Sequence, residues 1–79
     1  MRLVDLSPRD CIEASTGALG VSFKCPCCRK VRIVVFFGPG AAKRWTKTGD
    51  TFDTMTLTPS IDTSAAGHWH GFITNGEIQ

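Results

Sequence analysis

The 79-residue sequence has no long apolar run, because its longest uninterrupted apolar stretch, Ile33–Phe37, has five residues. A helix that crosses a bilayer needs about 20 apolar residues, so we expect no membrane span. The first residues, Met1–Asp5, include an acid where a secretion signal would have its apolar stretch, so we expect no such signal. The length also excludes a multidomain enzyme and a long coiled coil. The sequence therefore predicts a single domain over residues 1–79.

Acidic residues are missing from the middle of the chain. The formal net charge is +2, but residues 14–49 contain seven bases and no acid, which leaves −5 for the rest. A basic segment favours an acidic partner, either nucleic acid or an acidic protein surface. Trp45 within it could stack on a base or fill a pocket of the partner; the alternative is solvated charge with Trp45 in the core. The predicted partner-binding residues, called the basic rim below, are Lys24, Arg29, Lys30, Arg32, Lys43, Arg44, Trp45 and Lys47.

Short alternating segments predict a mainly β domain with little helix. Apolar residues at every second position are typical of half-buried strands. Helix is restricted to one or two turns within Pro8–Ser15, where Ser7 could cap and Pro8 could take the first helical position. The expected strands are Leu19–Lys24, Val31–Phe37, Met55–Thr58 ended by Pro59, Trp69–Ile73 closed by Asn75-Gly76, and an edge strand within residues 1–6.

The spacing of cysteine and histidine predicts a zinc site. Cys25 and Cys28 lie in a turn between two expected strands, at a separation that lets two thiolates bind one Zn²⁺. His68 and His70 would share one face of the last strand, which completes a Cys2His2 set; Cys27 is an alternative ligand to Cys28. Small domains often need such a link for stability. The expected fold is therefore a small zinc-stabilised, zinc-ribbon-like antiparallel meander or compact sandwich.

Other interpretations of these residues stay open. The cysteines could be free thiols, Cys11 could form a disulfide with one of the others, or the Cys-x-x-Cys pair could be redox-active. Four protein ligands would leave no position for water on the metal, so we expect structural zinc and no enzymatic activity. A Ser/His/Asp triad could be assembled from residues of this chain, but the same is true of most sequences, so its presence does not indicate a serine hydrolase. A small zinc-dependent hydrolase with an open metal position near Asp50 or Asp53 is the remaining enzymatic alternative.

Five motifs follow one another in a specific order. They are Cys25-Pro26-Cys27-Cys28, Trp45, Gly49-Asp50, Thr56-Leu57-Thr58-Pro59-Ser60-Ile61 and His70-Gly71-Phe72-Ile73-Thr74-Asn75-Gly76. Together they resemble a family of small phage and prophage zinc-binding proteins of unknown function. The resemblance implies a zinc-binding β domain with Cys25, Cys28 and His70 as ligands, and it implies no reaction.

The phage setting of that family, by analogy, adds a biological role. We expect a small phage-type binding protein in the cytoplasm of a bacterial host, as a monomer or a homodimer. It would engage a host protein or nucleoprotein complex through the basic rim and inhibit host defence in the manner of an anti-CRISPR protein. Direct binding of nucleic acid is the alternative.

Overall fold

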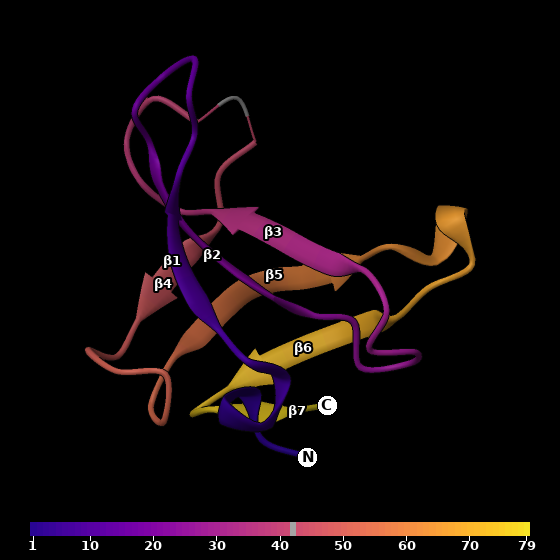
Figure 1. The fold of residues 1–79 in the computed structure, drawn as a ribbon. Coiled ribbons are helices and arrows are strands. Elements are labelled where there is room, and N and C mark those ends of the chain that lie inside the picture. The colour runs from indigo at the N-terminus through magenta and orange to yellow at the C-terminus, as the bar shows by residue number, and fades with distance from the viewer. Residues whose placement is uncertain (42) are drawn as a thin grey trace.

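Two antiparallel β-sheets make up the computed structural model, which describes residues 1–41 and 43–79 (Figure 1). The three-stranded sheet has the order β1 (Arg9–Ile12), β2 (Leu19–Lys24), β3 (Arg32–Phe36). The four-stranded sheet has the order β4 (Thr46–Thr48), β5 (Thr56–Asp62), β6 (His70–Thr74), β7 (Glu77–Ile78). Two short 3-10 helices, η1 (Leu3–Leu6) and η2 (Ser64–Ala66), are the helical segments. The expected mainly β fold is confirmed, and no helix of the described part is long and apolar enough to cross a membrane.

One hydrophobic core lies between the two sheets. Alternate residues of β2 and β3 supply Val21, Phe23 and Val35, while Leu57 and Ile73 come from β5 and β6. Burial of apolar surface of this kind is the main favourable term in folding. The buried core comprises Leu3, Leu6, Val21, Phe23, Cys25, Ile33, Val35, Met55, Leu57, Ile61 and Ile73.

The first twelve residues differ from the expectation. Leu3 and Leu6 are fully buried on one 3-10 turn, because residues three apart lie on the same side of such a turn. The expected edge strand is therefore wrong, although Arg2 forms an isolated bridge with Glu77. The helix expected within Pro8–Ser15 is also wrong, since Arg9–Ile12 pairs with β2. Pairing with a distant strand outweighs the local capping preference of Ser7 and Pro8.

Strand β5 does not end at Pro59 but continues to Asp62. The Thr58–Pro59 peptide bond is cis, and the pairing with β6 changes register at this point. Leu57 lies opposite Ile73 and Ile61 lies opposite Gly71, so β5 spans four residue steps where β6 spans two. A bulge accommodates the extra residues, which is where proline is tolerated within a strand. Ser60 belongs to this bulge.

The backbone of β6 is closely surrounded at Gly71. A Cβ atom at this position would lie 2.0 Å from the Gln79 carbonyl oxygen and 2.8 Å from the Trp69 ring. Phe72 and Gln79 exchange backbone hydrogen bonds of 3.2 and 2.9 Å beside it. Close packing around Gly71 therefore fixes the path of the chain on both sides of His70.

Two neighbouring valines of β3 test the position of the core. Val35 is buried, with 1% of its surface exposed, whereas Val34 faces solvent with 48% exposed. Val35→Ala should lower the free energy of unfolding by about 2 kcal/mol, from lost burial and the cavity left behind. Val34→Ala, the matched control, should cost less than half as much. Chemical denaturation measures both, and equal losses would contradict this arrangement of the sheet.

Candidate functional site

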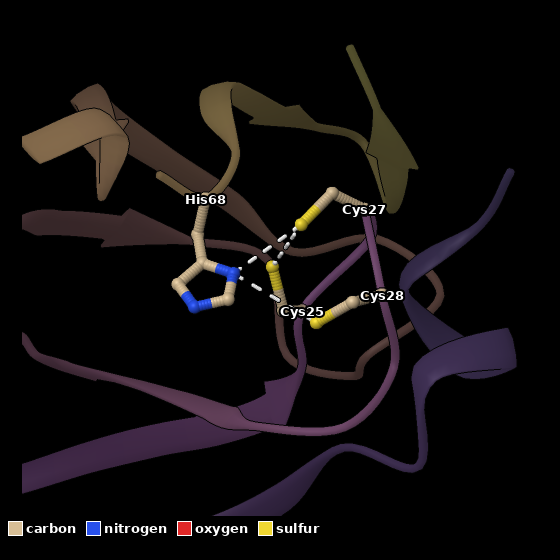
Figure 2. A group of neighbouring side chains, drawn as sticks. All are labelled: Cys25, Cys27, Cys28 and His68. Carbon is tan, nitrogen blue, oxygen red and sulfur yellow. Dashed lines mark hydrogen bonds between the residues drawn. The ribbon is translucent and has the colours of Figure 1, made fainter. Parts of the chain in front are cut away.

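The turn between β2 and β3 brings three cysteines together. The Cys25 N–H donates to the Val31 carbonyl and the Arg29 N–H donates to the Cys25 carbonyl, both at 2.8 Å, which closes the turn. Arg29 has a positive φ of 57°, a left-handed conformation that is uncommon for residues other than glycine. Figure 2 shows that the side chains of Cys25, Cys27 and Cys28 point toward His68.

The segment that leads into β6 delivers His68 to this turn. The His68 N–H donates to the Thr63 carbonyl at 3.1 Å, and the Thr63 N–H donates to the Trp69 carbonyl at 3.0 Å. The Trp69 ring packs edge-to-face on Phe23, with ring centroids 6.2 Å apart. These contacts hold His68 against the three-stranded sheet.

The four donor atoms fit the geometry of a metal ion. Cys25 Sγ and Cys27 Sγ are 3.2 Å apart, and His68 Nδ1 lies 3.4 Å from Cys27 Sγ and 3.8 Å from Cys28 Sγ. All four lie within 4.8 Å of one another. Tetrahedral zinc with bonds of about 2.3 Å to sulfur and 2.0–2.1 Å to nitrogen would separate its ligand atoms by about 3.5–3.8 Å. The cluster can therefore hold a metal ion through three cysteines and one histidine.

Two thiols of the cluster, those of Cys25 and Cys27, affect each other's ionisation. Burial raises the pKa of Cys25, but hydrogen bonds from the Trp69 backbone, the Cys27 side chain and the Cys27 and Cys28 backbones outweigh it and lower this pKa to about 6. The hydrogen bond to Cys25, followed by desolvation, raises the pKa of Cys27 to about 11. The Cys25 thiolate forms readily, and it opposes ionisation of the Cys27 thiol. A bound cation would stabilise both thiolates.

The cluster differs in composition from the expected Cys2His2 set. Cys25, Cys28 and His68 come together, and Cys27 joins them in addition to Cys28 rather than in its place. His70 lies outside the cluster. The sequence argument placed both histidines on one strand face, but β6 begins only at His70. Because His68 precedes the strand, its side chain is free to turn the other way.

His70 instead approaches a serine. Its Nε2 lies 3.4 Å from Ser60 Oγ in the β5 bulge. The carbonyl of Ser60 accepts a hydrogen bond of 3.4 Å from the Trp45 indole. Asp62, two residues after Ser60, is the direct cross-strand partner of His70. Ser60 and His70 both lie within the motifs of the sequence, but nothing in their spacing pairs the serine with the histidine.

The residues of the basic rim occupy two separate places. Lys24, Arg29 and Lys30 lie in or beside the cysteine turn before β3, whereas the loop that contains Lys43 and Arg44 follows β3, at its other end (Figure 1). Five of the rim residues, Arg32, Lys43, Arg44, Trp45 and Lys47, make contacts within the protein. Arg32 donates to Ser22 and to the Ser7 carbonyl, and Arg44 donates to the Phe37 carbonyl. The Lys43 ammonium lies over the Trp45 ring and the Lys47 ammonium over the Phe37 ring. Trp45 is half-buried and packs against the core.

Comparisons with known proteins add a family. A family model described as "Bacterial ubiquitination-like system serine protease (BubE)" matches residues 5–79. No curated protein and no solved structure matches the chain. The family is named for a protease, so the expectation of a protein without enzymatic activity is wrong. The match spans nearly the whole sequence, and the chain therefore belongs to the BubE family of bacterial ubiquitination-like system serine proteases.

Proposed function

We propose that this protein is a serine protease of a bacterial ubiquitination-like system, with Ser60 as its nucleophile and His70 as its general base. The observation that carries the proposal is the 3.4 Å approach of His70 Nε2 to Ser60 Oγ in a chain whose family is named for serine protease activity. A serine hydroxyl is a weak nucleophile until an adjacent base can accept its proton. The contact provides that base.

The reaction proceeds through an acyl-enzyme. Ser60 Oγ attacks the carbonyl carbon of the scissile peptide bond while its proton passes to His70 Nε2. His70 then returns that proton to the leaving amine as the C–N bond breaks, which leaves the substrate acyl group esterified to Ser60. Water, deprotonated by the same imidazole, hydrolyses the ester and restores the free hydroxyl. Every proton in this sequence passes through one nitrogen atom.

The placement of Ser60 supports this role. Bulges occur next to active sites because they redirect one side chain out of a regular strand, and the β5 bulge turns Ser60 toward the neighbouring strand. The Trp45 indole holds the Ser60 carbonyl. His70 is exposed and Ser60 is half-buried, so a polypeptide chain can reach both side chains on the outer face of the four-stranded sheet.

We also propose that Cys25, Cys27, Cys28 and His68 hold a structural Zn²⁺. Three thiolates and one imidazole are a usual donor set for structural zinc, and four protein ligands close the site. His68 is separated from His70 by Trp69 alone, and Trp69 is packed on Phe23. A metal bound at this cluster would fix the start of β6 and, through it, the position of His70.

The remaining expectations from the sequence stay predictions. They are phage origin, binding of a host protein or nucleoprotein complex or of nucleic acid through the basic rim, inhibition of host defence, location in the bacterial cytoplasm and a monomeric or homodimeric state.

A fluorophosphonate probe tests the nucleophile without knowledge of the substrate. We expect the wild-type protein to be labelled at Ser60 and Ser60→Ala not to be labelled. His70→Ala should slow labelling by about 10²–10⁴-fold, the usual contribution of a general base. Ser15→Ala removes an exposed hydroxyl from another turn and is the matched control. Peptide mass spectrometry locates the modified residue, and a label on another serine would contradict the assignment.

Metal analysis tests the zinc proposal. Native mass spectrometry should find one Zn²⁺ per chain in the wild type and none in Cys25→Ser. Cys11→Ser should keep the metal, because Cys11 is a free cysteine outside the cluster. A ligand present at 1,000 times its Kd stabilises a fold by about 4 kcal/mol, so a strong chelator should lower the melting temperature by more than about 10 °C. A metal-free protein with an unchanged melting temperature would refute the proposal.

A further inference from the structure

A carboxylate lies directly across the ladder from His70. Asp62 on β5 and His70 on β6 are paired residues of the antiparallel register, and directly opposed side chains have Cβ atoms about 4.5–5.5 Å apart. Ser60 lies two residues before Asp62 on the same strand, so both can flank His70 on one sheet face. The His70 imidazole therefore contacts the Ser60 hydroxyl, and Asp62 is its direct partner on the neighbouring strand.

The hydrogen bonds of Asp62 leave one of its oxygens free. Oδ1 accepts from the Ser64 N–H at 2.9 Å and from the Ser64 hydroxyl at 2.5 Å. Among the described residues, no hydrogen bond reaches Asp62 Oδ2 or His70 Nδ1. Two atoms are thus available for a further hydrogen bond, His70 Nδ1 and Asp62 Oδ2. They belong to residues that are paired across the two strands.

The electrostatics of Asp62 agree with this arrangement. Hydrogen bonds from the Ser64 side chain and then its backbone lower the pKa of Asp62, and the nearby His70 and Lys43 act in the same direction. Asp62 is therefore a carboxylate at neutral pH, and it is held by the turn that starts η2. A carboxylate that is already held in place loses little side-chain entropy when it accepts a further bond.

We propose that Asp62 is the positioning residue of the protease, accepting a hydrogen bond from His70 Nδ1–H through Oδ2. The proposal rests on the proposed function of Ser60 and His70. The bond would keep the proton of neutral His70 on Nδ1, so that Nε2 presents its lone pair to Ser60 Oγ. It would also stabilise the imidazolium that forms when His70 takes the serine proton. Asp62 itself would exchange no proton.

Asp62→Asn is the discriminating variant. Asparagine keeps an Oδ1 acceptor for Ser64 but presents an NH2 group in place of the free oxygen, which favours the His70 tautomer with its proton on Nε2. That tautomer cannot accept the proton of Ser60. We expect the rate of fluorophosphonate labelling at Ser60 to fall by at least about 10-fold and by up to about 10⁴-fold. Asp62→Glu, which retains a carboxylate, should recover part of that loss.

Two further measurements separate positioning from folding. Long-range ¹H–¹⁵N NMR should show His70 protonated on Nδ1 in the wild type and on Nε2 in Asp62→Asn. The melting temperature should change little, because the side chain of Asp62 is exposed. Asp50→Asn removes an exposed carboxylate from the loop between β4 and β5 and is the control for the loss of charge; its labelling rate should equal that of the wild type.

The outcomes distinguish the positioning role of Asp62 from the proposed protease function of Ser60 and His70. Slow labelling of Asp62→Asn with the changed tautomer supports a positioning role. Wild-type labelling at Ser60 together with an unchanged rate and tautomer in Asp62→Asn would overturn the role of Asp62 and leave the protease assignment intact. A wild-type protein that is not labelled at Ser60 would overturn both.

Discussion

The approach of His68 to the cysteine turn is the contact on which both candidate sites depend. The turn belongs to the three-stranded sheet and His68 leads into β6 of the four-stranded sheet, so this contact joins the sheets beside the start of β3. At the end of β3, the Trp45 N–H donates to the Phe36 carbonyl at 2.9 Å. The indole N–H of Trp45 donates to the Ser60 carbonyl. The candidate nucleophile and base are thus supported from both ends of one strand.

The sequence predicts the fold best where a strand is long and one of its faces is buried. Leu19–Lys24 has apolar residues at every second position, and the structure forms β2 over those residues, although this central strand is buried on both faces from Gly20 to Phe23 and Leu19 is exposed. Strands β4 and β7 have three and two residues, too few for a periodic pattern. The segment Arg9–Ile12 has local preferences for a helix, and its strand state depends on pairing with β2, which local composition does not encode.

The candidate sites are less visible in the sequence, for different reasons. The cysteine turn is local, so its spacing alone predicts a metal cluster, while the choice of His68 over His70 depends on the residue at which β6 begins. Ser60 is an unremarkable serine until the bulge in β5 turns it toward His70. That bulge follows from a change of register between two strands. Pairwise register is a property of the folded sheet, and no motif spacing reports it.

The two proposed sites would be linked thermodynamically, because only Trp69 separates His68 from His70 along the chain. The metal would bind at His68 and the substrate would bind beside His70. Trp69, between them, packs against Phe23 in the core. If metal occupancy improves the affinity for a substrate by some factor, the substrate must improve retention of the metal by that same factor. If the metal is zinc, a cell low in zinc would then keep the occupied form mainly where substrate is abundant, so the proposed protease activity would follow metal supply and substrate level together.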